Sequence, residues 1–152
     1  MPAGTRLRAA RSTGAGPGRL LVAVYAFFAL AAGARAGWQL TTRWDEAPVA
    51  YLLSALAAAI YLVAAVGLAR GGPVARRVAA GCCTVELTGV LAVGTASLVW
   101  PGGFGHATVW SGYGIGYGFV PLVLPVLGLL WLRRTRPDRS PGNFPNQVNH
   151  VQ

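Results

Sequence analysis

The chain has 152 residues, of which 54% are hydrophobic and only 11% are charged. A soluble domain carries about a quarter charged residues, and here the apolar residues form long runs instead of recurring at helical period, which indicates lipid contact. The net charge is +9, and every basic residue is an arginine. These arginines lie at the ends of the apolar runs, so a bilayer explains them better than nucleic acid, and we expect no nucleic-acid partner.

Four apolar segments predict an all-α, polytopic membrane protein with four transmembrane helices. The second segment, Pro48–Ala69, has no charged residue, and it opens with a proline, which the first turn of a helix tolerates. The expected spans cover residues 20–40, 48–69, 78–100 and 113–132. We expect residues 1–19 and 133–152, which are polar, basic and rich in glycine and proline, to be disordered tails.

Charge and aromatic residues set the expected orientation. Both tails and the 70–77 segment carry most of the arginines. We therefore expect the protein to lie in the cytoplasmic membrane with both termini in the cytoplasm. Tryptophans are typical of the two membrane interfaces. In this arrangement the outer belt consists of Trp38, Trp44, Trp100 and Trp110, and Trp131 lies on the inner side.

A second interpretation exists for the first span. A basic stretch, the apolar run Leu20–Ala36 and an Ala-Arg-Ala or Ala-Gly-Ala site also describe a cleaved signal peptide. Both interpretations leave Trp38 on the outer side, so the topology of the later spans is the same.

Small residues predict how the helices pack, because helices in lipid associate through close backbone approach. The third span has a small residue at every fourth position, on one helical face, and the fourth span opens with two overlapping GxxxG pairs. The first set is Ala80, Thr84, Thr88, Ala92 and Ala96, and the second is Gly112, Gly114, Gly116 and Gly118.

Glu86 is the single charge in the third span. A carboxylate at that depth is costly, so intramembrane acids usually have a function or a partner. Counting 1.5 Å per residue places Glu86 about 12 Å from the inner edge, level with Tyr61 of the second span, and we expect the Tyr61 hydroxyl to donate to it. Glu86 and Tyr61 are therefore the candidates either for proton handling or for a structural hydrogen bond.

Arg35 is the other charge within an apolar run. Its height on the first span and the inward direction of both side chains make a pair with Glu86 unfavourable. We expect Arg35 to be an outer-face anchor whose charge reaches the interface and pairs there with Asp45 or Glu46.

No chemistry-bearing motif accompanies these residues. Cys82 and Cys83 are adjacent in an apolar run and are interpreted as small core residues, and His106 and His150 lie outside the membrane and far apart. No nucleophile–base set, phosphate loop or metal-ligand spacing is present. We therefore expect no enzyme activity, no metal and no cofactor.

Three segments carry a resemblance to a known group: LLVAVYAFFALAAGARAGWQL, EAPVAYLLSALAAAIYLVA and ATVWSGYGIGYGFVPLVLPVLGLLWLRR. Over about residues 20–134 the chain resembles uncharacterised small four-span integral membrane proteins of actinobacteria. The resemblance implies the four-span architecture and no particular activity.

Two functions are therefore expected. The first is an accessory or assembly partner in the cytoplasmic membrane, with the lipid bilayer, another membrane protein or a second copy of the chain as partner. The alternative is a small proton-coupled transporter that uses Glu86.

Overall fold

The computed structural model describes residues 16–135, and every regular element in that range is a helix. Three of the elements are long and apolar enough to cross a membrane, and the last two form a bent pair that meets the same criterion when taken together. The all-α class is thus confirmed, whereas the tail predictions for residues 1–15 and 136–152 fall outside the described range. The elements are α1 (Pro17–Thr42), α2 (Pro48–Arg70), α3 (Pro73–Val99), the 3₁₀ helix η1 (Ser111–Tyr117) and α4 (Val120–Arg134).

Each α-helix begins with a proline in its first turn, where no amide donor is needed. Because of Pro17 and Pro73, α1 and α3 begin earlier than the spans predicted at residues 20 and 78. The basic segment predicted as a turn over residues 70–77 is therefore mostly helix. Glu86 consequently lies at the midpoint of α3, about 20 Å from either end of the helix.

The fourth predicted span, 113–132, is the element that differs most from expectation. Its glycines do not form a helical packing face, because Gly112, Gly114 and Gly118 have φ values of 55°, 82° and 62°. A backbone with positive φ favours glycine, and here it interrupts the helix so that the chain changes direction. The result is η1, a bend of 97°, and then α4.

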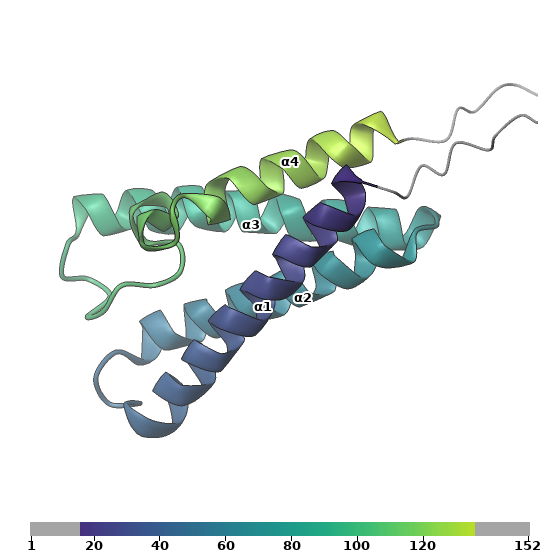
Figure 1. The fold of residues 1–152 in the computed structure, drawn as a ribbon. Coiled ribbons are helices and arrows are strands. Elements are labelled where there is room, and N and C mark those ends of the chain that lie inside the picture. The colour runs from purple at the N-terminus through teal and green to yellow at the C-terminus, as the bar shows by residue number, and fades with distance from the viewer. Residues whose placement is uncertain (1–15, 136–152) are drawn as a thin grey trace, which may run out of the picture.

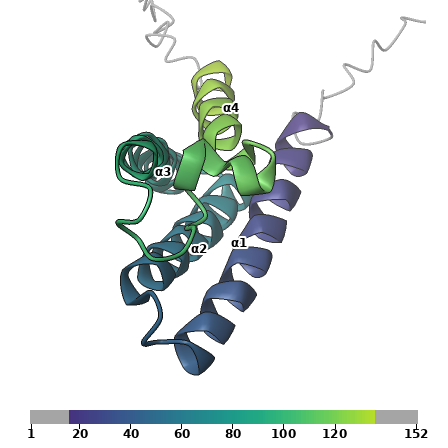
Figure 2. The same ribbon diagram turned by 90° about the vertical axis from the view of Figure 1, so that its left-hand side faces the viewer.

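The helices form two antiparallel pairs joined by close contacts (Figure 1). The start of α1 lies beside the end of α4, where Gly18 leaves room for the ring of Trp131. At the same end Arg76 of α3 donates hydrogen bonds to Thr135 and to the carbonyl of Leu132. Figure 2 shows η1 at the opposite end, between α3 and α1. The two ends of the described chain therefore emerge on one side of the bundle.

Glycines and alanines bring α3 close to its neighbours, but not on the predicted face. A Cβ at Gly67 of α2 would lie 3.1 Å from the Ala79 Cβ, and one at Gly128 of α4 would lie 2.7 Å from Cys83 Sγ. The buried residues of α3 are Ala79, Cys83, Glu86, Val90 and Gly94.

The predicted small-residue face of α3 points away from this core. Thr84, Thr88 and Ala92 are exposed, and each threonine hydroxyl donates to a carbonyl one turn earlier in the same helix. The prediction that this face packs within the bundle was wrong, because Glu86 and Cys83 bury the opposite side of α3.

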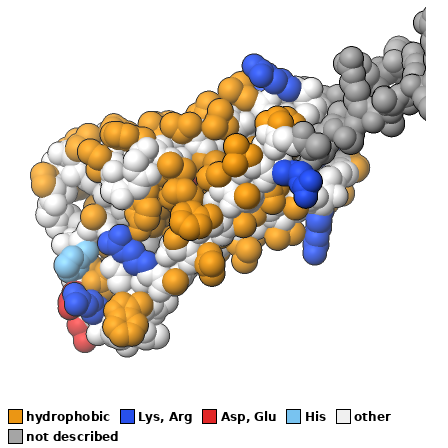
Figure 3. Space-filling view, viewed as in Figure 1, with side chains coloured by type: hydrophobic (Ala, Val, Ile, Leu, Met, Phe, Trp, Pro, Cys, Tyr) orange, Lys and Arg blue, Asp and Glu red, His pale blue; other side chains and the backbone are white. Residues whose placement is uncertain are grey.

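The surface of the bundle has an apolar middle and polar ends (Figure 3). Trp38 and Trp100 are exposed, as expected for interface residues, whereas Trp110 is buried. Arg19, Arg70, Arg133 and Arg134 lie at the end where α1 begins and α4 ends, and the acidic Asp45 and Glu46 lie in the turn between α1 and α2.

Gly114 offers a test of the bend. Replacing Gly114 with Ala places a Cβ 2.8 Å from the Pro121 ring in a backbone with φ 82°, whereas Gly116 has open space around its Cβ position and no positive φ. We expect Gly114→Ala to lower the free energy of unfolding by about 2–4 kcal/mol and Gly116→Ala to change it little, as measured in mixed micelles. Equal effects of the two variants would contradict the bent geometry.

Candidate functional site around Glu86

The carboxyl group of Glu86 is completely enclosed, with an exposed fraction of 0%. The Tyr25 hydroxyl of α1 donates a hydrogen bond of 3.0 Å to Oε2, and Tyr25 is itself fully buried. Burying a polar group without a partner costs several kcal/mol in hydrocarbon, so this bond anchors α1 against α3. The helix that reaches Glu86 is therefore the first and not, as predicted, the second.

Cys83 lies one turn before Glu86 on the same face of α3. Its Sγ is 3.3 Å from the Tyr25 hydroxyl, and either group can be the donor. Gly128 of α4 faces both side chains, since a Cβ there would lie 2.7 Å from Sγ and 3.4 Å from the Tyr25 hydroxyl. A side chain on α4 at this position would push the cluster apart, so the missing Cβ lets three helices meet around it.

Three buried polar atoms of the described residues have no hydrogen-bond partner, and they belong to one neighbourhood. They are Glu86 Oε1, the Tyr61 hydroxyl and Trp110 Nε1. Tyr61 of α2 has both of the others as neighbours, Glu86 and Trp110, but the hydrogen bond predicted between Tyr61 and Glu86 is not formed. The Tyr61 hydroxyl is therefore an unpaired donor next to the unpaired carboxyl oxygen, and Trp110 is next to Tyr61.

Trp110 reaches this neighbourhood from the connection between α3 and η1. Its ring lies against α3 at Gly89, where a Cβ would be 2.9 Å from the ring carbons, and it is 3% exposed. Tyr113 similarly lies against Gly94, and its hydroxyl is 3.0 Å from Thr95 Oγ1. The segment thus enters the bundle from the end of α3, and the placement of Trp110 in the outer belt was wrong because these glycines accept the rings.

Serine side chains of α2 and α3 hold the backbone of the segment that carries Trp110. Ser54 of α2 accepts a hydrogen bond from Val109 N at 3.4 Å, and Ser97 of α3 accepts one from Gly112 N at 2.9 Å. Non-helical backbone at membrane depth must be satisfied inside the protein. These two serines satisfy it, and they fix the height of Trp110 between them.

Arg35 of α1 contacts Tyr117 of η1. Its Nη1 donates a hydrogen bond of 2.9 Å to the Tyr117 hydroxyl, and its guanidinium carbon lies 5.9 Å from the centre of that ring. No ion pair joins Arg35 to an acidic residue within residues 16–135, so the predicted partner at Asp45 or Glu46 and the disfavoured partner Glu86 are both absent there.

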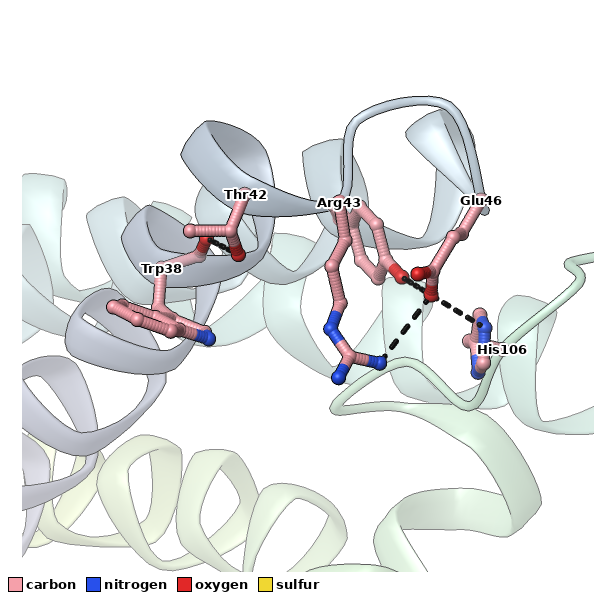
Figure 4. A network of polar contacts seen from close by, with 6 residues as sticks. Trp38, Thr42, Arg43, Glu46 and His106 are labelled. Carbon is pink, nitrogen blue, oxygen red and sulfur yellow. Dashed lines mark hydrogen bonds and ion pairs between the residues drawn. The ribbon is translucent and has the colours of Figure 1, made fainter.

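Glu46 has other partners, as Figure 4 shows. Its Oε2 lies 3.4 Å from Arg43 Nη1 and 3.3 Å from His106 Nε2, and it accepts a bond of 3.4 Å from the Tyr51 hydroxyl. In the same view Thr42 donates to the carbonyl of Trp38. This cluster ties the α1–α2 turn to the loop after α3.

A row of aromatic rings connects the Glu86 cluster with Arg35. Ring centres are 6.2 Å apart between Tyr25 and Tyr61, 6.5 Å between Tyr61 and Phe28, and 6.1 Å between Phe28 and Tyr117. Edge and tilted contacts of this kind are favourable and rigid. These rings form a continuous packed path from Tyr117 to the residues around the carboxyl.

The chemistry available at this site is that of an isolated acid. Groups of three or more His, Cys, Asp or Glu arranged for a metal ion are not found among the described residues. A carboxyl with one donor on Oε2 and a free Oε1 can hold a proton, and it can release that proton only if its surroundings change to support the charge.

Sequence reasoning found Glu86, Tyr61 and Cys83 but missed Tyr25 and Trp110. Tyr25 is the only polar side chain in the first apolar run before Arg35, which is a signal that could have identified it. Trp110 carried no such signal, because its position next to a glycine-rich stretch is typical of an interface tryptophan.

Comparison with family models, curated proteins and solved structures finds no match to this chain.

Two tyrosines distinguish this geometry from the predicted one. Tyr25→Phe removes the sole hydrogen bond to Glu86 and should lower the free energy of unfolding by about 1–3 kcal/mol. Tyr61→Phe removes a hydroxyl that has no partner, so its effect should stay within about 0.5 kcal/mol. Unfolding in mixed micelles measures both, and a larger loss for Tyr61→Phe would show that Tyr61 is the donor.

Proposed function

We propose that the chain is a multi-pass protein of the cytoplasmic membrane, with four spans and both termini in the cytoplasm. The bent pair of η1 and α4 makes the fourth span. The end of the bundle where α1 begins and α4 ends carries Arg70 and Arg133, while Asp45 and Glu46 lie at the other end. This distribution supports an inward-facing basic end.

Cysteine labelling tests the topology. In a variant whose two native cysteines are replaced by serine, we expect His106→Cys to react in intact cells with a maleimide that does not cross membranes. Arg70→Cys, at the other end of the bundle, should react only after the cells are opened. Labelling of both positions in intact cells, or of Arg70→Cys alone, would contradict the orientation.

Within this framework the function that we propose is proton-coupled transport, with Glu86 as the proton-binding group. The observation that carries the proposal is the enclosed carboxyl with one oxygen bonded to Tyr25 and the other unpaired, next to the unpaired hydroxyl of Tyr61. A carboxyl with only a packing role would have both oxygens satisfied. The spare hydroxyl of Tyr61 is instead a donor that an ionised carboxylate needs after it loses its proton.

The position of Trp110 adds a means of control. Its donor comes from a non-helical segment and not from a helix, and such segments occur at membrane depth mainly in binding and transport sites. A shift of that segment changes the contact between Trp110 and Tyr61, which is the neighbour of Glu86. In this way loading and release of the proton can be coupled to a movement at the outer side of the bundle.

A second candidate function is that of an accessory or assembly partner. It is favoured by the exposed small-residue face of α3, where Thr84, Thr88 and Ala92 offer a flat surface for close approach of another helix. This role makes no use of the proton on Glu86. The two functions therefore differ in what happens when the carboxyl is made unable to ionise.

Glu86→Gln separates the two candidates. In infrared difference spectra of the lipid-embedded protein, we expect the wild type to show a protonated-carboxyl band that disappears as pH rises, and Glu86→Gln to lack it. Glu46→Gln, which changes an exposed carboxylate, is the matched control and should behave as the wild type.

The assembly role predicts another result. A wild-type band that persists unchanged at all pH values would contradict proton-coupled transport. Retained expression and unfolding behaviour of Glu86→Gln would then support a carboxyl that only packs. Thermal unfolding of each variant confirms that the comparison is made on folded protein.

A further inference from the structure

A pocket of about 340 Å³ lies at the end of the bundle where η1 meets α1 and α3. This volume lies within the range of small-molecule sites. Its wall combines Arg35 of α1 with residues of one continuous stretch, 97–117, which runs from the end of α3 through the loop after it to η1. The polar side chains that line it are Arg35, Ser97, His106, Thr108, Ser111 and Tyr117.

Arg35 gives this pocket its charge. A guanidinium has five N–H donors, and the one side-chain bond that Arg35 makes is the bond from Nη1 to the Tyr117 hydroxyl. None of the described residues that line the pocket is acidic. Glu46 contacts the lining residue His106 and also pairs with Arg43, but it does not line the pocket itself. Most of the guanidinium donors therefore remain available in a pocket that contains no negative charge of its own.

The other polar groups of the wall are fixed in place. Ser97 accepts from Gly112 N at 2.9 Å and donates to the carbonyl of Gly94 at 2.8 Å. Ser111 Oγ accepts from Thr108 N at 2.9 Å. Tyr117 accepts from Arg35, so its own O–H remains free to donate, and its ring is held by Phe28. The wall is rigid and presents donors, which suits an acceptor ligand.

We propose that this pocket binds a small oxyanion, whose carboxylate or phosphate oxygens pair with the Arg35 guanidinium and accept a second hydrogen bond from Tyr117. The fork of a guanidinium matches two oxygens of such a group, and a charged hydrogen bond of this kind is about twice as strong as a neutral one. The site is separate from Glu86, and it stands whether or not Glu86 exchanges a proton. Its ligand is either a soluble anion or the phosphate of a lipid headgroup, since both present the same oxygens.

The test uses the full chain purified in a nonionic detergent without phosphate. Sodium phosphate and sodium acetate are titrated at constant ionic strength against sodium chloride, and dioleoylphosphatidylglycerol is added in a separate series. The measured quantity is the midpoint of thermal unfolding, which rises when a ligand binds the folded state. Arg35→Gln removes the guanidinium, and Arg43→Gln removes an exposed arginine outside the pocket.

We expect phosphate or acetate, or the anionic lipid, to raise the midpoint of the wild type and of Arg43→Gln, and the rise to vanish in Arg35→Gln. A rise with the salts identifies a soluble anion, and a rise with the lipid alone identifies a headgroup. Tyr117→Phe, which keeps the ring and the guanidinium, should weaken binding about tenfold and serves if Arg35→Gln does not fold. A rise that is equal in all variants, or no rise with any probe, would overturn the proposal.

Discussion

The structure depends on the need to satisfy one carboxyl group in an interior that lacks water. Glu86 lies at the midpoint of α3 and is fully enclosed, so its partners must come from neighbouring helices. Tyr25 provides the hydrogen bond, and Gly128 provides the space in which it forms. Lipid gives helices no hydrophobic reason to associate, so this polar contact and the small residues beside it decide which faces meet.

The same constraint explains why the chain between α3 and α4 is not a simple loop. Its glycines at positive φ turn the backbone into the bundle, and serines of α2 and α3 satisfy the amides that a helix would have satisfied itself. The rings of Trp110 and Tyr113 then lie in notches at Gly89 and Gly94. Two of the positive-φ residues, Tyr113 and Phe119, are not glycines, so strain of about 1–3 kcal/mol each is held at this junction.

A row of aromatic rings lies between the buried acid and the pocket at Arg35. Phe28 lies between Tyr61, beside the carboxyl, and Tyr117, which holds Arg35. If both proposals hold, the segment that carries Trp110 and Tyr117 connects ligand binding at Arg35 with the surroundings of Glu86, because Tyr117 contacts Arg35 and Trp110 contacts Tyr61.

The amino-acid sequence by itself determined that the chain is helical, where its first three membrane-length helices lie, and that Glu86 is exceptional. These properties follow from the length of the apolar runs and from the cost of charge in lipid, both of which are local. Tertiary structure alone decided that Tyr25 and not Tyr61 reaches Glu86, that Arg35 faces Tyr117, and that the α3 face with Thr84 and Thr88 points outward. The physical reason is that the rotation of each helix depends on its contacts, and a depth count gives height without rotation.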